Sequence, residues 1–316
     1  SIEPGEPYGK ELRLLAHVLA TARPGDAASV CAAVESFGEE TLPGTSHWLK
    51  IAGGVKAEIL AAAARKAPRG GVVLEVGTYC GFSATRMAAA RADLGPRHSA
   101  RVVTLEVDAA HAMIARCLLA FAGVAHHVEV LTGHSEDVLP WAMARIQERR
   151  GSDPCVDVVF LDQRGSRYEA DLEVLERAGV LSDGAVVVAD NVLKPGAPLF
   201  LWRVARGGGY STEALSVQEY AMSGVEDWVT VSVHHRGQGT GLVPAPEELR
   251  ALDWKAEQMR ARAHRPDHGG SGIGFQEWAD FAADMKRGFA EVGLKAQAPE
   301  PWLRSPDREG VTAEEG

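Results

Sequence analysis

The chain has 316 residues, with 33 lysines and arginines against 43 aspartates and glutamates, which gives a net charge of −10. This acidic balance excludes a general binder of nucleic acid or of an anionic membrane surface, because both need a basic face. Hydrophobic residues make up 46% of the chain, as in globular proteins, and no apolar stretch reaches the roughly 18–20 residues that span a bilayer. Four scattered cysteines favour a reduced compartment, either the cytoplasm or an organelle reached by a leader removed before Ser1.

The N-terminal part of the chain has the periodicity of helices. Apolar residues recur at helical spacing over residues 8–21, and Asp26 is a suitable N-cap for a second helix over 27–37. A loop rich in Pro, Gly and Ser leads to an alanine-rich stretch over 53–66. The sequence therefore predicts three helices before the first strand.

From residue 71 onward, short valine-rich runs alternate with helix-like segments. Continuous apolar runs of this kind indicate parallel strands that are covered on both faces, as in a doubly wound α/β fold. Two more β-like runs follow without a long helix between them, and they predict an antiparallel hairpin at one edge of the sheet. The seven predicted strands are residues 71–76, 101–107, 127–132, 156–162, 184–190, 211–217 and 226–234.

After residue 235 the composition changes again. A Gly- and Pro-rich linker precedes two helix-like stretches over 247–263 and 275–291, and the last twenty or so residues are polar enough to be loose. We therefore divide the chain into a domain over 1–235 and a two-helix extension over 236–316. The second helix has one apolar face, expected to pack on the domain or on a protein partner, formed by Phe275, Trp278, Phe281, Met285 and Phe289.

A glycine turn follows the first predicted strand. In LEVGTYCGFSA, Gly77 and Gly81 bracket the passage from strand to helix, where a ligand can approach the backbone and the helix N–H groups. The spacing differs from the G-x-G-x-x-G pattern of nicotinamide-binding proteins. Glu106, at the end of the second strand, is placed to accept hydrogen bonds from two ribose hydroxyls, or else is a solvated carboxylate.

Two acidic positions follow neighbouring strands further along. Asp162 ends the fourth strand, and Asp190 with Asn191 ends the fifth, so these side chains should meet at the carboxyl edge of a parallel sheet. Two carboxylates and an amide oxygen are ligands suited to Mg²⁺, and the lack of His and Cys disfavours zinc. The alternative is two unrelated acids that cap the following helices.

The blocks LEVGTYCGFSA, TLEVD, GHSEDVLP, VFLDQRGSRY and VVVADNVLKPGAP resemble those of catechol O-methyltransferases. The resemblance covers about residues 8–234. It implies the seven-stranded class I methyltransferase fold, S-adenosylmethionine (SAM) and Mg²⁺ as cofactors, and a small phenolic substrate.

The same resemblance assigns roles to individual residues. It implies that Gly77, Tyr79 and Ser83 line the methionine end of the cofactor, beside Gly81, that Glu106 holds the ribose and that Ser135 meets the adenine. Asp162, Asp190 and Asn191 would bind the metal. Glu219 resembles the glutamate that contacts the second catechol hydroxyl, and Trp48 and Pro195 resemble the apolar residues that flank the ring.

Several positions near these residues depart from the family pattern. The catalytic lysine of the family falls on Gly165, and the two residues before it are Gln163 and Arg164. Lys50 replaces a methionine and Glu136 a glutamine. A positioned base adds about 10²–10⁴-fold to a rate, so we expect slower catalysis rather than none.

Two hypotheses remain open from the sequence. The first is an active O-methyltransferase on a catechol-like phenol, in which Lys50 is a candidate substitute base and Gly165→Lys should raise turnover. The second is a catalytically impaired domain that serves as a structural or interaction subunit. A nicotinamide oxidoreductase is disfavoured by the glycine spacing.

Overall fold

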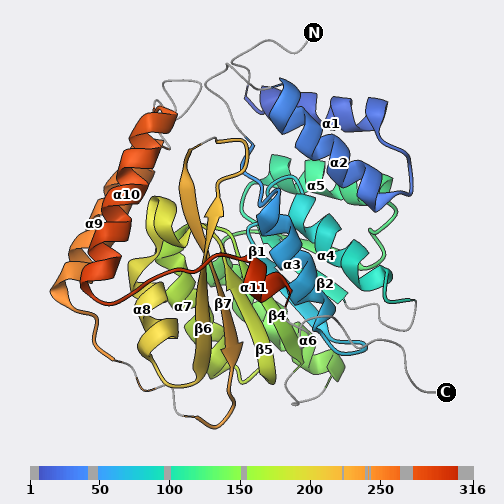
Figure 1. Cartoon of the computed structure of the whole chain (residues 1–316). Coiled ribbons are helices and arrows are strands. Elements are labelled where there is room, and N and C mark those ends of the chain that lie inside the picture. The colour runs from blue at the N-terminus through green and yellow to red at the C-terminus, as the bar shows by residue number, and fades with distance from the viewer. Residues whose placement is uncertain are drawn as a thin grey trace.

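A computed structural model describes residues 7–41, 49–95, 101–150, 155–222, 224–238, 241, 243–263 and 273–304. Its centre is one seven-stranded sheet in the order β3-β2-β1-β4-β5-β7-β6 (Figure 1). The order confirms the expected class I methyltransferase topology. The strands are β1 (Val72–Val76), β2 (Arg101–Glu106), β3 (Val128–Thr132), β4 (Val156–Leu161), β5 (Leu181–Ala189), β6 (Tyr210–Gln218) and β7 (Glu226–His234).

The central strands are buried on both faces because their alternate valines enter two different hydrophobic layers. Val73 and Val158 pack into one layer, whereas Val72 and Val159 pack into the other. The first layer is covered by α1 (Gly9–Thr21), α2 (Ala27–Ser36), α3 (Val55–Arg65), α4 (Phe82–Ala92) and α5 (Ala109–Phe121). The second is covered by α6 (Ser135–Arg150), α7 (Tyr168–Arg177) and α8 (Pro198–Arg206).

The predicted hairpin is present and is antiparallel. β7 pairs with β5 on one side and with β6 on the other, so that β6 is the outermost strand. The hairpin brings two acidic residues, Glu219 and Asp227, to the same edge at which β4 and β5 end, as the contacts described below show.

The C-terminal extension packs on the domain itself. Two helices, α9 (Glu247–Ala263) and α10 (Phe275–Glu291), lie against each other beside the hairpin (Figure 1). Phe281, Met285 and Phe289 belong to the second hydrophobic layer, and Phe289 lies 5.4 Å from Trp228 between ring centroids. The apolar face of α10 is therefore covered by the chain's own core, except for Phe275, which stays 43% exposed.

The segment after α10 is more ordered than its polar sequence predicts. Gln297 exchanges backbone hydrogen bonds with Ala214 and Ser216 of β6, both within 2.9 Å. A short helix, α11 (Glu300–Leu303), then buries Trp302 against the first hydrophobic layer. The expectation of a loose tail was wrong for 297–304, because one tryptophan and one backbone pairing anchor it. No helix among the described residues is long and apolar enough to cross a membrane.

Candidate active site

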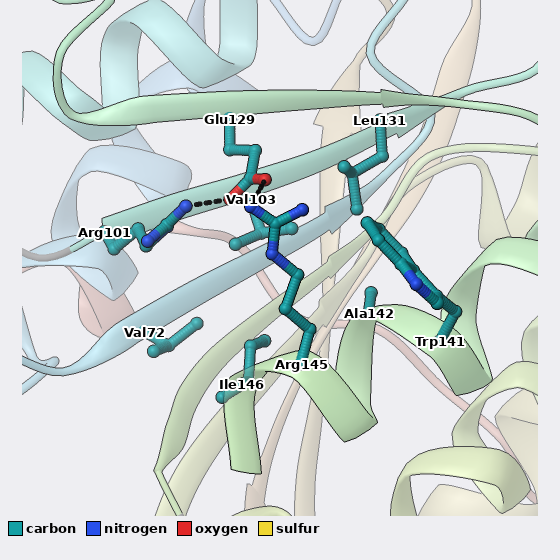
Figure 2. Close-up of a pocket in the computed structure, with 9 residues that line it drawn as sticks. All are labelled: Val72, Arg101, Val103, Glu129, Leu131, Trp141, Ala142, Arg145 and Ile146. Carbon is teal, nitrogen blue, oxygen red and sulfur yellow. Dashed lines mark hydrogen bonds and ion pairs between the residues drawn. The ribbon is translucent and has the colours of Figure 1, made fainter. Parts of the chain in front are cut away.

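One large cavity opens at the carboxyl ends of the parallel strands, where ligands of such sheets bind. Its volume is about 670 Å³, within the range of small-molecule sites. A second cavity of about 140 Å³ lies between β1–β3 and α6 (Figure 2) and contains none of the predicted residues. The larger cavity is lined by most of them, namely Lys50, Gly77, Tyr79, Glu106, Ser135, Asp162, Asp190, Asn191, Pro195 and Glu219. Trp48 lies outside the described residues.

The glycine turn after β1 is fixed by close backbone packing. Gly77 has φ +107°, and a Cβ there would lie 2.3 Å from the carbonyl oxygen of Asp162. Only glycine can therefore bring this turn against the end of β4. Gly81 and Ser83 lie behind the cavity rather than on it: a Cβ at Gly81 would meet Ala115 of α5 at 3.1 Å. Glycine at 81 thus serves helix packing.

Glu106 is held in a defined orientation at one end of the cavity. Its two carboxylate oxygens accept hydrogen bonds from the backbone N–H groups of Tyr79 (2.7 Å) and Asp108 (2.9 Å). Each oxygen keeps a lone pair for a further donor, as a ribose diol requires. His111, which the sequence reasoning missed, lines this end and packs edge-on against Tyr79 at 4.9 Å between ring centroids.

Ser135 begins α6 on the wall beside Glu106. Its hydroxyl donates to Asp171 at 3.1 Å, and Gln163 also donates to Asp171. Burial raises the pKa of the Asp171 carboxyl, although these hydrogen bonds oppose the shift. The Gln163 side chain thus helps to fix the wall on which Ser135, the residue predicted to meet the adenine, lies. Glu136, on the same helix, is exposed and pairs with Arg167 at 3.1 Å.

Asp162 and Asp190 converge from β4 and β5, as predicted. Burial raises the pKa of Asp162 well above its usual range, and the neighbouring Asp190 carboxylate raises it further. Asp162 has no side-chain hydrogen-bond partner among the residues that the structure describes. Burial likewise raises the pKa of Asp190 to about 6, with Asp227 and Glu219 adding to the effect and Lys56 opposing it. A cation placed between the two carboxylates would relieve the same repulsion.

The orientation of Asn191 is set by its neighbours. Its amide nitrogen donates to Asp227 at 2.8 Å, so its carbonyl oxygen is the atom left to face a cation. The backbone of Asn191 has φ +53°, a left-handed conformation that asparagine adopts more readily than most residues. Within the described ranges no three His, Cys, Asp or Glu residues form a metal cluster. The predicted set consists instead of two carboxylates and this amide.

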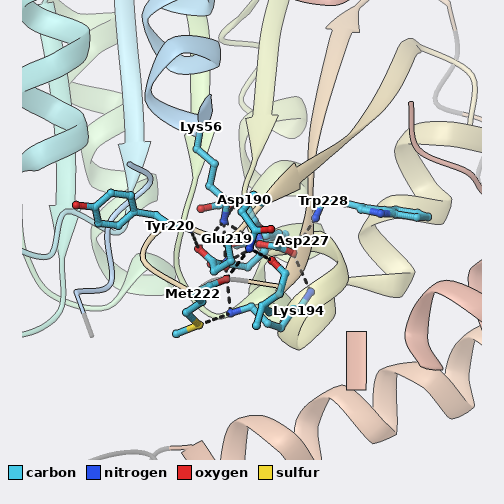
Figure 3. Close-up of polar contacts among 12 residues, drawn as sticks. Lys56, Asp190, Lys194, Glu219, Tyr220, Met222, Asp227 and Trp228 are labelled. Carbon is cyan, nitrogen blue, oxygen red and sulfur yellow. Dashed lines mark hydrogen bonds and ion pairs between the residues drawn. The ribbon is translucent and has the colours of Figure 1, made fainter. Parts of the chain in front are cut away.

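A buried lysine, Lys56 of α3, joins these acids to the hairpin (Figure 3). Its ammonium lies 2.7 Å from Asp190, 2.8 Å from Asp227 and 3.1 Å from Glu219, measured to the carboxylate oxygens. All four side chains are less than a tenth exposed. Burial alone would lower the pKa of Lys56, but the three carboxylates outweigh it and raise the pKa well above its usual range.

Glu219 is shared by two lysines. Burial disfavours its ionised form, yet the ammonium groups of Lys56 and Lys194 lower its pKa to about 2. The Lys194 ammonium lies 3.0 Å from Glu219 and 4.8 Å from the ring centroid of Trp278, a residue of α10. Glu219 is therefore ionised at neutral pH and faces the cavity beside Asn191.

The position of the absent lysine is closely packed. A Cβ at Gly165 would lie 2.8 Å from the carbonyl oxygen of Gly196 and 2.7 Å from Nη2 of Arg260, which comes from α9. Arg260 donates a hydrogen bond to that carbonyl and pairs with Glu257, and Arg164 pairs with Glu257 too. A lysine at 165 would have to displace Arg260 and the Gly196 carbonyl, so we no longer expect Gly165→Lys to raise turnover simply by restoring a base.

Lys50 stands at the other end of the cavity from the acids. It is exposed, and the charges that act on it are those of Lys10, Glu11 and Glu106. Lys50 thus lies near Glu106, which is expected to hold the ribose, and not near Asp162 and Asp190.

Comparisons with known proteins agree with this geometry. The sequence model of a methyltransferase domain family matches residues 74–192. Over 236 residues the chain is 37% identical to catechol O-methyltransferase of Mus musculus, covering 74% of this chain and 81% of that protein. The chain belongs to the catechol O-methyltransferase family. The family enzyme of Sus scrofa is 38% identical over 179 residues, covering 56% of this chain and 88% of that protein.

A solved structure supports the same fold. The O-methyltransferase TomG from Streptomyces achromogenes, involved in tomaymycin synthesis and crystallised in complex with SAM, is 27% identical, with a TM-score of 0.50. The match covers 68% of this chain and 92% of TomG. The sequence did not indicate several residues of this site. They are Lys56, Asp227 and Lys194, together with Arg260 and Trp278 from the C-terminal extension.

Proposed function

We propose that this member of the catechol O-methyltransferase family transfers a methyl group from SAM to one hydroxyl of a catechol-like phenol, with Mg²⁺ as a second cofactor. The observation that carries the proposal is a single cavity that connects Glu106 to the Asp162–Asp190 pair. Both groups of residues line the same cavity of about 670 Å³, which offers room for one cofactor and one acceptor.

The cofactor end supports SAM. Glu106 presents two fixed oxygens to a ribose, and the Gly77 turn allows close approach of the methionine part to the backbone. Ser135 begins α6 at the wall where the adenine would lie. TomG, which shares the fold, was crystallised with SAM.

The charge of the acidic cluster supports a divalent cation. Four carboxylates, those of Asp162, Asp190, Glu219 and Asp227, face two ammonium groups, those of Lys56 and Lys194. With all four carboxylates ionised the cluster would carry two uncompensated negative charges in a largely buried place, which is costly, and the raised pKa values of Asp162 and Asp190 reflect that cost. Asp162, Asp190 and the Asn191 carbonyl would hold Mg²⁺, an ion that prefers such oxygens. When bound, the ion would increase the acidity of a coordinated phenol hydroxyl.

The protein's own contribution to the reaction is positioning. Glu219, ionised at neutral pH, accepts a hydrogen bond from the second hydroxyl and so aligns the first with the sulfonium methyl. Bound SAM would supply the methyl group to the phenol oxygen and leave as S-adenosylhomocysteine, while the phenol proton would pass to solvent. With glycine at 165 we expect turnover lower by about 10²–10⁴-fold than with a positioned base.

Isothermal titration calorimetry and a methylation assay test this proposal together. We expect micromolar SAM binding, and Mg²⁺-dependent formation of a methylated product from pyrocatechol. Asp162→Asn should abolish Mg²⁺-dependent methylation while SAM still binds. Lys295→Gln, at an exposed position shortly after α10, should match the wild type. The absence of SAM binding would refute the proposal and leave a structural role for the domain.

A further inference from the structure

The C-terminal extension lines part of the cavity. Arg260 and Ala263 of α9 and Trp278 of α10 contribute to its wall, although all three lie outside the seven-stranded domain. The residues expected to hold the cofactor, such as Glu106 and Ser135, all belong to the domain itself. The question is therefore what the extension does at the other, acceptor end of the cavity.

The extension holds the loop of residues 192–196, which directly follows the predicted metal ligands. Arg260 donates a hydrogen bond to the carbonyl oxygen of Gly196. Met285 of α10 is fully buried and packs closely on the same residue, since a Cβ at Gly196 would lie 2.8 Å from its methyl carbon. This loop carries Lys194, which lines the cavity, so the extension helps to set where that side chain stands.

Lys194 links the extension to Glu219. Its ammonium lies 3.0 Å from the Glu219 carboxylate and 3.7 Å from the sulfur of Met222 (Figure 3). The same ammonium lies 4.8 Å from the ring centroid of Trp278. Lys194 is 5% exposed and Trp278 is 3% exposed, so water has little access to either. The contact between them is therefore a desolvated cation–π interaction, which is the stronger kind.

This contact helps to orient the Glu219 carboxylate. Lys56 comes closest to one of its oxygens, at 3.1 Å, and Lys194 comes closest to the other, at 3.0 Å. Two ammonium groups in different places favour one orientation of the carboxylate plane. If the ring of Trp278 were lost, the long Lys194 side chain would lose one of the groups that hold it, and Glu219 would lose a fixed partner. Misplacement of such a group by about 1 Å can slow a reaction on the order of 10²-fold.

We propose that Trp278 and Lys194 are positioning residues for methyl transfer, and that the extension thereby completes the acceptor site of the domain. Trp278 holds the Lys194 ammonium, the ammonium holds the Glu219 carboxylate, and Glu219 accepts the hydrogen bond of the second phenol hydroxyl. This inference rests on the proposed function, because it assigns further residues to the same site. Changes in α10 should therefore affect the turnover of the acceptor and leave SAM binding at Glu106 unchanged.

Trp278→Leu and Trp278→Phe, made in the full-length protein, test the proposal as a pair. Both new side chains are apolar and smaller than indole, but only phenylalanine keeps an aromatic face for the ammonium. We expect kcat for pyrocatechol, expressed per SAM-binding site counted by isothermal titration calorimetry, to fall roughly tenfold in Trp278→Leu and much less in Trp278→Phe. Kd for SAM should be unchanged in both. Equal losses of kcat in the two variants, or no loss in Trp278→Leu, would overturn the inference.

Lys194→Met and Lys194→Arg provide a second test, which leaves the packing of α10 intact. Lys194→Met removes the ammonium and should reduce kcat per SAM-binding site at least as much as Trp278→Leu does. Lys194→Arg keeps a positive charge and should retain more of the turnover. A general loss of stability would reduce the number of SAM-binding sites and not kcat per site. Wild-type kcat in Lys194→Met would contradict the assignment.

Phe275→Leu is the matched control. Phe275 is an aromatic residue about one turn before Trp278 on α10, is 43% exposed and is not among the residues that line the cavity. Its replacement should keep the wild-type kcat, and a loss as large as that of Trp278→Leu would refute the inference. If the wild type binds SAM but methylates no catechol, the proposed function fails and this inference fails with it. Methylation that the Trp278 and Lys194 variants do not slow refutes only this inference.

Discussion

Lys56 offers the most direct perturbation of the acidic cluster. Its ammonium contacts three carboxylates within 3.1 Å, and none of the groups is more than a tenth exposed, so water cannot replace it in Lys56→Met. Breaking a buried ion pair on one side costs about 3–5 kcal/mol, and three carboxylates lose the same partner here. We therefore expect the free energy of unfolding to fall by at least about 4 kcal/mol at pH 8.

The loss of stability in Lys56→Met should depend on pH and on Mg²⁺. Without the ammonium, the pKa of Asp190, already raised to about 6, rises further, so the variant gains a proton at mildly acidic pH and its penalty shrinks there. Mg²⁺ should recover part of the loss by replacing the missing positive charge. Urea denaturation at pH 5.5 and pH 8, with and without Mg²⁺, measures both effects, and Lys295→Met at an exposed site is the control. A loss below about 1 kcal/mol at pH 8, or one of equal size at both pH values, would refute this reasoning.

Two further predictions concern buried positions around the cavity. Burial raises the pKa of Glu75 from 4.5 to about 7, so the native state binds its proton more tightly than the unfolded state. The free energy of unfolding should therefore fall as pH rises from 4.5 to 7, by roughly 3 kcal/mol from this group. Glu75→Gln should remove this fall, as measured by urea denaturation across this pH range. Wild-type and variant free energies of unfolding that change in parallel with pH would contradict the prediction. Gly165→Ala should cost about 1–3 kcal/mol, because its Cβ would meet Gly196 and Arg260, and Gly165→Lys should not raise turnover. Faster methylation by Gly165→Lys in a steady-state assay would show that Arg260 and the backbone at Gly196 can move aside at little cost, and would contradict this prediction.

The sheet could be predicted because its strands are encoded locally. Runs such as VDVVFLD combine β-branched residues with uniform hydrophobicity, and the chain order of strands and helices limits the topology to few choices. The convergence of Asp162 and Asp190 followed from the same logic, since the carboxyl ends of parallel strands meet at one edge. Residues 297–304 differ from the predicted loose tail because the burial of Trp302 and the pairing of Gln297 with β6 are tertiary contacts that composition does not encode.

The rest of the site depends on contacts between distant segments. Lys56 stands in an alanine-rich helix, where nothing in the local pattern separates a buried lysine from a solvated one. Asp227 lies in a strand of the hairpin, 171 positions from its ion-pair partner Lys56. From the sequence alone, Gly165 indicates the loss of a catalytic base. In the structure, the absence of a side chain at 165 leaves room for Arg260 of α9. Only the docking of the extension brings that arginine to the cavity.

Crystals grown with SAM and soaked in Mn²⁺, a divalent ion with a usable anomalous signal, test the central claim most directly. An anomalous difference map should show one peak bounded by the carboxylates of Asp162 and Asp190 and the carbonyl oxygen of Asn191, beside the sulfonium of bound SAM. A map without a peak at these three residues, with SAM in place, would contradict the account of the site.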